Sequence, residues 1–492
     1  MNVSYDAVVV GSGPNGLAAA IRLAQEGLSV LVAEANDTIG GGARSAELTL
    51  PGFMHDTCSA VHPLAAGSPF FRTLPLGNYG LNWIEPEFAL AHPLDNGTAA
   101  VLQRSVRTTA QGLGRDQAAY ERLMGPLAAN WEALAEEFLQ PLFHMPRHPL
   151  LLARFGLRAV RSATALAQSW FADEPARALL AGLAAHSFLP LEQSPAAAFA
   201  LVLGALGHAV GWPFPRGGAQ RIANALAARL RALGGELATQ APVQSIDQLP
   251  LARAVLLNLT PRQVLRLAAH KLPPSYQARL QNFRYGPGVF KIDYAMDWPI
   301  PWKAAACARA GTVHLGGTLG EIAASERDVA RAQPPERPFV ILSQPSLFDA
   351  TRAPEGCRVV WAYCHVPNGS TFDMTGRIEN QIERFAPGFR DGILARRVMN
   401  CEQLERQNAN LVGGDISAGV ADWRQLLARP VLSPTPYRTP TPGLYLCSAS
   451  TPPGGGVHGM CGFHAAEVAL RDISMRAPRT LRPRWTRQVN PI

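Results

Sequence analysis

The sequence is poor in lysine and has no pair of cysteines at a redox or metal-binding spacing. Only three of its 45 basic residues are lysines, at positions 271, 291 and 303. No basic run is interleaved with aromatic residues, so the net charge of +8 does not indicate a nucleic-acid-binding protein. The seven cysteines form no C-x-x-C, and no histidine pair completes a zinc-like spacing. We therefore expect reduced thiols, no bound metal and no redox disulfide.

The start of the chain also lacks a basic segment followed by an apolar one, so no secretory signal is visible. One apolar run, residues 196–214, approaches the ~20 residues that a membrane-spanning helix needs. Three glycines and a proline interrupt this run, and His208 lies within it, which favours a buried helix lining an apolar cavity. We expect a cytoplasmic protein whose 492 residues form about two or three domains.

Residues 150–161 leave peripheral membrane contact open as an alternative. They mix arginines with bulky apolar side chains, as in a helix that lies on a membrane with its arginines at headgroup level. A half-buried helix with a solvated basic face would show the same pattern. The arginine-rich tail from residue 476 onward is more typical of a solvated segment, although anionic lipid would attract it.

The most informative stretch lies at the amino terminus. An apolar run, residues 5–10, leads into Gly11, Gly13 and Gly16 at G-x-G-x-x-G spacing, and a helix-like run follows. The first glycine permits the tight turn, the second lets the backbone approach a pyrophosphate, and the third lets the helix pack on the sheet. Glu34 ends the next apolar run and is placed to bind ribose hydroxyls. The pattern predicts a dinucleotide site at a helix amino terminus.

A second glycine-rich turn, residues 40–45, follows Glu34 closely. Its arginine, Arg44, would neutralise charge on the same diphosphate that the helix terminus contacts. An ordinary surface loop is the alternative.

Later segments could complete the same sheet. Residues 215–220 open a helix over 221–233, and strand-like runs follow at 236–239, 243–246 and 254–259. Near the carboxyl end, residues 443–448 read as a strand, followed by a glycine-rich turn and a helix that begins near Gly459.

The middle of the chain divides into a helical part and a strand-rich part. Residues 113–170 have helical periodicity, and residues 171–191 predict a pair of helices. Short strands at 289–294, 312–315, 339–343 and 358–365 predict a mostly antiparallel sheet, with a loop at 328–338.

Together these segments resemble the phytoene desaturase-like flavoprotein oxidoreductases of the broader amine-oxidase type. Four segments in the family's order carry the resemblance: residues 8–16 with Glu34, 40–45, 215–218 with 234–235, and 444–466. Three others are similar to the branch with carotenoid ketolase-like and pyridine nucleotide-disulfide oxidoreductase domain-like proteins: 52–63, 289–302 and 361–367.

The resemblance implies a bound FAD and an α/β fold. An FAD-binding doubly wound Rossmann-like domain would carry an inserted α+β substrate domain, made of helices and a mostly antiparallel sheet. The implied segments are 1–72, 215–270 and 435–475 for the FAD domain, 73–214 and 271–434 for the helical and sheet parts of the substrate domain, and 476–492 for a basic tail. The implied FAD-binding residues are Gly11, Gly13, Pro14, Asn15, Gly16, Glu34, Gly41, Gly42, Ala43, Arg44, Val243, Ser448, Gly459 and Met460.

The implied activity is hydride transfer between a hydrophobic substrate, polyene or isoprenoid-like, and flavin N5, as in a desaturase or dehydrogenase. An isomerase, a reductive cyclase or a ketolase on a similar substrate stays open, as does a non-catalytic flavin-binding scaffold. No second G-x-G-x-x-G follows a strand, so we expect oxygen, a quinone or another acceptor to take the electrons.

Lys291, His365 and His458 are the candidate catalytic residues, and His464 is a further polar neighbour of the expected flavin site. Each also has a structural interpretation. Lys291 shares an apolar strand with Asp293, where an ion pair would satisfy it, and His458 could simply hydrogen-bond its own loop.

Overall fold

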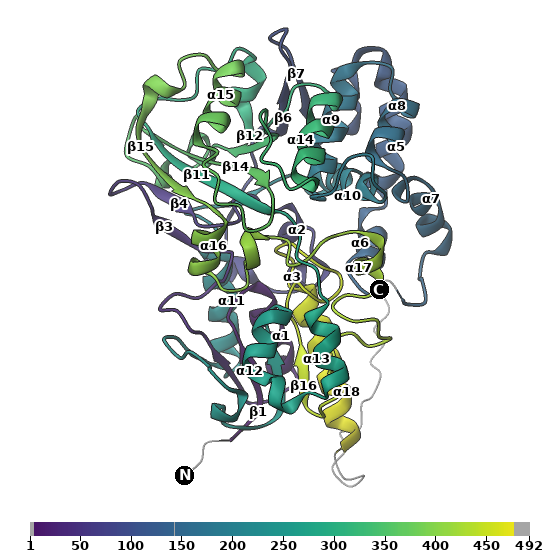
Figure 1. Cartoon of the computed structure of the whole chain (residues 1–492), viewed down its shortest axis with the longest axis vertical. Coiled ribbons are helices and arrows are strands. Elements are labelled where there is room, and N and C mark those ends of the chain that lie inside the picture. Colours follow the sequence, from purple (N-terminus) through teal and green to yellow (C-terminus); the bar gives the residue numbers. More distant parts are fainter. Residues whose placement is uncertain (1–3, 142, 477–492) are drawn as a thin grey trace.

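Two large sheets at opposite ends of the molecule organise the chain (Figure 1). The computed structural model describes residues 4–141 and 143–476. The lower sheet in Figure 1 contains the amino-terminal strand, and the upper sheet lies beside a group of helices. Of the predicted basic tail, residues 477–492 lie outside the described residues.

The lower sheet has five parallel strands in the order β16-β10-β1-β2-β9. Their bounds are β1 (Ser4–Val10), β2 (Val30–Ala33), β9 (Glu236–Ala238), β10 (Leu251–Leu257) and β16 (Leu444–Leu446). The apolar run of β1 is fully buried from Ala7 onward because the strand lies at the centre of the sheet. Strands from three distant parts of the chain therefore meet in one sheet, as in the predicted doubly wound domain.

Helices cover both faces of this sheet. On one face, α1 (Pro14–Gln25) packs against α11 (Gln220–Ala232) and α18 (Met460–Arg476). A Cβ atom at Gly462 would lie 1.7 Å from the Asn15 carbonyl oxygen, so this glycine lets α18 lie directly on α1. On the other face, α12 (Pro261–Ala268) and α13 (Pro274–Gln281) pack apolar side chains against Val10 and Leu257.

The upper sheet has seven strands in the order β15-β11-β14-β13-β12-β6-β7. Their bounds are β6 (Phe88–Pro93), β7 (Ala99–Leu102), β11 (Gly288–Met296), β12 (Ala310–Leu315), β13 (Val340–Ser343), β14 (Arg358–Val366) and β15 (Ile393–Met399). Every pairing is antiparallel except that of β6 with β12. The predicted mostly antiparallel sheet is confirmed.

The two faces of the upper sheet bury different partners because side chains alternate along each strand. On β11, Phe290 and Ile292 pack with Ile378 of α15 (Thr375–Phe385). Val289, which points to the opposite face, belongs instead to the large core cluster that continues into the helices and the lower sheet. Lys291 and Asp293 share that inward face.

The helices beside the upper sheet form the remaining layer. Their bounds are α4 (Val106–Gln111), α5 (Gln117–Ala129), α6 (Trp131–Phe138), α7 (Pro149–Ala159), α8 (Ala163–Trp170), α9 (Glu174–Ala185), α10 (Ala196–Ala209) and α14 (Leu319–Ala330). The apolar run at 196–214 thus contains a largely buried helix, α10, which packs on α9 and α5. Over residues 4–141 and 143–476, no helix combines the length and apolar character that crossing a membrane requires.

Short elements connect these layers. They are β3 (Ser45–Glu47), β4 (Met54–Asp56), β5 (Trp83–Ile84), β8 (Phe214–Pro215), α2 (Pro63–Ala66), α3 (Pro69–Arg72), α16 (Cys401–Gln407) and α17 (Trp423–Leu427). Strands β3 and β4 form an antiparallel hairpin beside the upper sheet, and β5 pairs with β8.

Three local predictions were wrong. Residues 243–246 are not a strand, because Ser245 and Gln248 form a capping box that starts a short 3-10 helix there. Residues 171–191 hold one helix, α9, because the chain turns after it and Phe188 takes a left-handed φ of 58°. The predicted loop at 328–338 begins later, since α14 extends to Ala330.

Candidate FAD site

The glycines of the first motif bring three backbone segments into close contact. Gly11 has a φ of +96°, a left-handed conformation that a side chain would strain. A Cβ atom at Gly16 would lie 2.0 Å from the Gly11 carbonyl oxygen, so no larger residue fits. Helix α1 then begins with no side-chain cap and no acidic residue in its first turn. Its first N–H groups and partial positive charge are therefore available to phosphate oxygens.

The second glycine-rich turn lies directly on the first. A Cβ atom at Gly41 would lie 3.1 Å from the Gly13 Cα, and Gly40 N donates to the Ser12 carbonyl oxygen at 3.2 Å. Gly41 also has a left-handed φ of 56°. Two turns that are separated by about one strand and one helix in the sequence thus form one surface, which a diphosphate could contact from both sides.

Glu34 closes this surface at the end of β2. Its carboxylate accepts hydrogen bonds from Ser12 N at 3.0 Å, Ser12 Oγ at 2.6 Å, and Asn36 N and Nδ2 at 3.0 and 2.9 Å. Burial alone would raise the pKa of this carboxyl, but the hydrogen bonds outweigh burial and hold the pKa below its ordinary value. An ionised carboxylate therefore lies beside the glycine turns, where it can accept from ribose hydroxyls.

The Arg44 side chain stabilises the second turn through hydrogen bonds to backbone carbonyl oxygens. Its Nε donates to the Gly41 carbonyl oxygen at 2.9 Å, and a terminal nitrogen donates to the Gln407 carbonyl oxygen at 3.3 Å. Ala43 is fully buried next to it, and Cys58 Sγ lies 3.8 Å from where a Cβ atom of Gly42 would be. The positive charge stays within the loop, so the predicted phosphate contact requires a ligand that reaches into this turn.

The carboxy-terminal segment approaches the same place. Ser448 follows β16 and is buried, and its carbonyl oxygen accepts from Thr451 N at 2.9 Å. Gly459 has a φ of 71° and is surrounded by Phe71 and Ala18 of the first segment. Helix α18 therefore starts, at Met460, against the part of the chain that carries the glycine motif.

His458 is held entirely by its own loop. Its Nδ1 accepts from Met460 N at 3.0 Å, and its Nε2 lies 3.2 Å from the Gly454 carbonyl oxygen. Burial lowers the pKa of this imidazole to about 4, so the ring is neutral at pH 7. Both ring nitrogens are engaged, and the catalytic role predicted for His458 would require one of these bonds to break. His464 similarly bonds the Leu139 carbonyl oxygen at 2.8 Å.

Lys291 projects from the inward face of the upper sheet. Its Nζ is hydrogen-bonded to the Asp293 carboxylate, and the two side chains are 2% and 0% exposed. Burial raises the pKa of the Asp293 carboxyl even though Lys291 acts in the opposite direction. Burial raises the pKa of the Cys58 thiol, although the charge of the Lys291 ammonium group acts in the opposite direction. Lys291 shares its sheet face with Val289, which belongs to the core cluster that continues into the lower sheet, so Lys291 lies on the side of the upper sheet that packs toward the lower one.

His365 lies on the same face of the sheet as Lys291, one step further along. It is two residues from Tyr363, which is the cross-strand partner of Lys291. Its Nδ1 is 2.9 Å from the Glu326 carboxylate, and its ring is tilted against that of Phe188, with the ring centroids 4.0 Å apart. Lys291 and His365 therefore share a sheet face, whereas His458 lies in the carboxy-terminal loop.

Two structural features of the site were missed from the sequence. The Asn258 side chain lies against all three motif glycines and donates to the Gly11 carbonyl oxygen at 3.2 Å. A polar residue directly after the buried strand β10 was the signal, because the carboxyl ends of parallel strands meet at one edge. The second feature is a buried ion pair between Arg352 and Asp56 at 2.7 Å.

Asp56 of that ion pair also holds the chain that follows the Pro-Arg-Gly-Gly segment, residues 215–218, in place. Asp56 also accepts from Ala219 N at 2.7 Å and from Ser45 Oγ at 2.7 Å. A Cβ atom at Gly218 would lie 2.3 Å from Ser45 Oγ, so the glycine lets the start of α11 reach this carboxylate. The segment joins the second FAD segment to the first through Asp56. Val243, also predicted to contact the cofactor, is partly buried against the apolar cluster under α12 and α13.

The paired glycine turns, the uncapped start of α1 and the ionised Glu34 fit the diphosphate and ribose of a dinucleotide. Residues 15–323, more than half of the chain, match the family of flavin containing amine oxidoreductases. The chain belongs to this family. Family membership and the fitted cradle together make the protein an FAD-dependent oxidoreductase, and they confirm the amine-oxidase type of flavoprotein indicated by the sequence motifs.

Individual relatives agree with this assignment. The chain is 29% identical to "Pyridine nucleotide-disulfide oxidoreductase domain-containing protein 2" of Rattus norvegicus, over 95% of this chain and 94% of that protein. It is 27% identical to the zeta-carotene-forming phytoene desaturase of Myxococcus xanthus, over 73% and 72%. The solved structure of an oxidoreductase from Methanosarcina mazei shares the fold, with a TM-score of 0.65 at 17% identity over 95% of this chain and all of that one.

Proposed function

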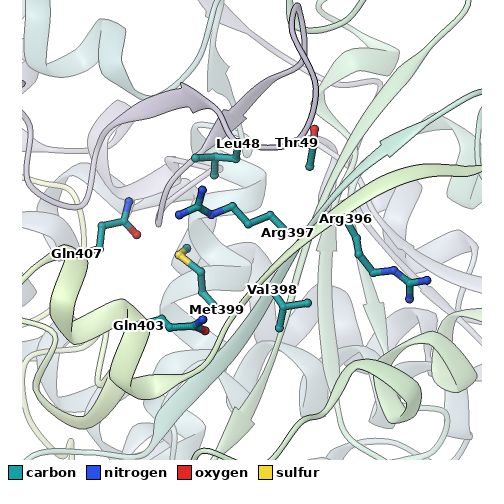
Figure 2. A pocket seen from close by; sticks show the side chains of 8 residues that line it. All are labelled: Leu48, Thr49, Arg396, Arg397, Val398, Met399, Gln403 and Gln407. Atoms are coloured by element: carbon teal, nitrogen blue, oxygen red, sulfur yellow. The ribbon is translucent and has the colours of Figure 1, made fainter.

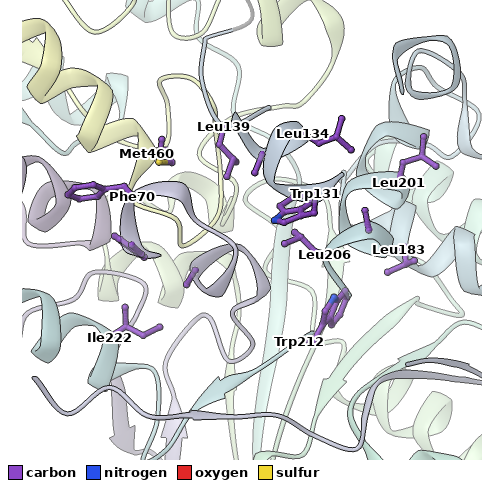
Figure 3. Close-up of a cluster of buried hydrophobic side chains, with 14 of the residues drawn as sticks. Phe70, Trp131, Leu134, Leu139, Leu183, Leu201, Leu206, Trp212, Ile222 and Met460 are labelled. Atoms are coloured by element: carbon purple, nitrogen blue, oxygen red, sulfur yellow. The ribbon is translucent and has the colours of Figure 1, made fainter. Parts of the chain in front are cut away.

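We propose that this oxidoreductase transfers hydride between a hydrophobic substrate, polyene or isoprenoid-like, and N5 of its FAD. The observation that carries the proposal is the cluster of buried apolar side chains beside the start of α18 (Figure 3). Met460 and Phe70 lie at one end of this cluster, which continues through Trp131 to Leu206 on α10. A substrate bound against such side chains would be stabilised mainly by the burial of apolar surface, about 25 cal/mol per Å².

The chain's residues would divide the work as follows. Gly11, Gly13, Gly41 and the start of α1 would hold the diphosphate, and Glu34 would hold the ribose. The other predicted contacts belong to the same cradle: Pro14, Asn15, Gly16, Gly42, Ala43, Arg44, Val243, Ser448, Gly459 and Met460. FAD, when bound, supplies the hydride acceptor. The start of α18 would stabilise negative charge that develops on it.

Proton movement falls to the polar groups on the sheet face. We propose that Lys291 first passes its own proton to the Asp293 carboxylate, to which it is hydrogen-bonded, and then, as a neutral amine, accepts the proton that a substrate loses along with the hydride. His365 would act further along the same face, and His458 through the start of α18. Oxygen, a quinone or another acceptor would then take the electrons from the reduced cofactor.

Anaerobic mixing with a candidate polyene tests the proposal. Loss of the oxidised flavin absorbance with a product two mass units lighter supports desaturation. Loss of absorbance with a product of the same mass as the substrate would favour an isomerase. A product that has gained an oxygen atom would favour a ketolase. Unchanged absorbance with every polyene, in a protein that carries FAD, would support the flavin-binding scaffold instead and overturn the proposal.

The surface around α7 suits peripheral contact with an anionic membrane. Leu150 and Leu157 on α7 are 77% and 76% exposed, and Phe143 and Met145 in the preceding loop are 60% and 89% exposed. Arginines accompany them: Arg147, Arg154, Arg158 and Arg161. Exposed apolar groups flanked by arginines would insert at headgroup level and deliver a lipid-soluble substrate. This arrangement supports the membrane-surface alternative for residues 150–161.

Sedimentation with vesicles tests this contact. We expect native protein to bind vesicles that contain phosphatidylglycerol, and a Leu150→Asp/Leu157→Asp double variant to bind them much less. Leu251→Asp is the matched control, because Leu251 is 70% exposed on a different element, β10. Equal binding by the double variant and the control would contradict membrane docking through α7.

A further inference from the structure

A chain of polar side chains links buried Lys291 to a pocket on the molecular surface. Figure 2 shows the residues that line this pocket. The pocket has a volume of about 440 Å³ and lies between the β3–β4 hairpin, β15 and α16. Its lining includes Thr49 from the hairpin and Arg397 and Met399 from β15. Met399 is the cross-strand partner of Lys291, and Arg397 is that of Asp293. Two residues of the pocket lining are thus one strand spacing, about 5 Å, from the two residues of the ion pair.

His55 of β4 lies between the pocket and the ion pair. Its Nε2 is 2.8 Å from Thr49 Oγ1, a hydrogen bond to the pocket lining. Its Nδ1 is 3.7 Å from Asp293 Oδ1. Neither of these two facing atoms has a hydrogen-bond partner in the described part of the chain, and both side chains are at most 1% exposed. A shift of less than about 1 Å would bring them to hydrogen-bond distance.

These two unpaired atoms face each other across a gap that a proton could bridge. An unmade buried hydrogen bond is unfavourable, and each one in a native protein requires an explanation. Lys291 and Arg352 approach His55 as cations, and Asp56 and Asp293 as carboxyl groups. Burial, reinforced by the two cations, lowers the pKa of His55 to about 3. The imidazole is therefore neutral, with one nitrogen that donates and one that accepts.

We propose that Thr49, His55 and Asp293 form a proton path between Lys291 and solvent in the pocket. This inference rests on the proposed function, because it needs Lys291 to take up the proton that accompanies hydride transfer. The Lys291 ammonium group passes a proton to the Asp293 carboxylate and, as a neutral amine, takes up the proton that the substrate loses. Rotation about the Asp293 Cβ–Cγ bond then presents the transferred proton to His55 Nδ1. His55 releases a proton from Nε2 to Thr49, whose hydroxyl releases one to water. One proton enters and one leaves, no electron moves, and Lys291 and Asp293 regain their starting charges. His55 then carries its proton on Nδ1 instead of Nε2, and a proton that passes back along the path restores the first tautomer.

A cofactor-free measurement tests whether the path is connected. In protein labelled with ¹⁵N-histidine, we expect the His55 Nδ1 resonance to shift in Asp293→Asn and the Nε2 resonance to shift in Thr49→Val. The imidazole should stay neutral between pH 5 and 8 in the native protein. Resonances that are unchanged in both variants would overturn the proposed connection, whether or not FAD binds.

A kinetic measurement, which does not require the substrate to be known, tests whether protons move along this path. FAD-loaded protein is photoreduced without oxygen and then mixed with oxygen, whose reduction to hydrogen peroxide consumes a proton. We expect His55→Ala to slow flavin reoxidation about 100-fold, within the ~10²–10⁴-fold range of positioned proton transfer, and to increase the solvent deuterium isotope effect. Imidazole added to the buffer should enter the pocket and restore the rate.

Two further variants keep the test interpretable. Thr49→Val lies in a partly exposed hairpin loop, so it should slow reoxidation even if His55→Ala fails to fold. His270→Ala is the matched control, since His270 pairs with Asp247 at the surface, and it should have no effect. Native rates in Thr49→Val and in folded His55→Ala, or failure of imidazole to restore His55→Ala, would overturn the path. Protein that takes up no FAD would instead count against the proposed function.

Discussion

Replacement of Glu34 separates its two roles, in the loop and toward the cofactor. In Glu34→Ala, the buried Ser12 N–H loses its acceptor, and leaving such a donor unpaired costs about 1–3 kcal/mol. The Asn36 donors are exposed and can turn to water, so they add little. Loss of a hydrogen bond between a carboxylate and a ribose hydroxyl costs about 1.5–3 kcal/mol, or about 10–100-fold in the Kd of FAD. Glu34→Gln keeps one acceptor oxygen and should show smaller effects of both kinds.

Two assays on the same preparations distinguish these effects. Fluorescence titration of cofactor-free protein gives the Kd of FAD, and thermal unfolding gives the stability of the loop. An Ala variant with lower thermal stability but native affinity would refute the ribose assignment, because the carboxylate would then serve the loop alone. Native values of both quantities would refute the reading of Glu34 as a buried, ionised acceptor.

The lowered pKa of Glu34 predicts how its contribution to the stability of the folded protein changes with pH. The pKa of the Glu34 carboxyl is lowered in the folded protein relative to its ordinary value of 4.5. Its stabilisation is therefore complete above about pH 4.5 and is lost as the pH falls through the folded pKa. We expect the difference in unfolding temperature between native protein and Glu34→Gln to shrink below pH 4.5. A difference that grows in acid would contradict the lowered pKa.

Two other substitutions test the cradle. Gly16→Ala places a Cβ atom 2.0 Å from the Gly11 carbonyl oxygen, with backbone on both sides, so the purified variant should lack flavin absorbance. Gly156→Ala is the control, because a Cβ atom there meets nothing within 4 Å, and this variant should keep the absorbance. Arg352→Met leaves the buried Asp56 carboxylate without its cation, which should lower the free energy of unfolding by about 3–5 kcal/mol in denaturant titrations. Yellow Gly16→Ala protein, or Arg352→Met of native stability, would contradict these assignments.

The sequence predicted the parts of the site that depend on backbone conformation. Gly11, Gly16 and Gly41 stand where the chain has a left-handed φ or where two backbones touch, so a side chain at these positions would be strained or would clash. Their spacing therefore indicated the turns, and the order of apolar runs indicated the strands on either side. The residue limits of the domains and the individual cofactor contacts remain predictions, since they depend on the bound ligand.

The sequence-based predictions were wrong or weak where tertiary packing or a local helix cap determines the structure. Residues 243–246 begin and end with β-branched apolar residues, but the capping box of Ser245 and Gln248 satisfies the backbone in a different way. Asn258 gave only a weak signal, because a single asparagine after a strand is common in ordinary turns. Its contact with the three glycines depends on β10 lying next to β1, which no local pattern in either segment specifies.

The polar path illustrates why the chemistry of a site is harder to predict than its frame. Lys291 and Asp293 are two residues apart, so the strand period placed both on one face and an ion pair could be foreseen. His55 and Thr49 lie more than 200 positions earlier, in a hairpin whose sequence resembles any strand entering a loop. His55 approaches Asp293, and Thr49 contacts His55, because the β3–β4 hairpin packs beside the upper sheet, in which β15 pairs with β11 in one register. A shift of that register by one residue would turn Arg397 and Met399 to the opposite face, so the position of these pocket residues beside the ion pair depends on the register of the sheet.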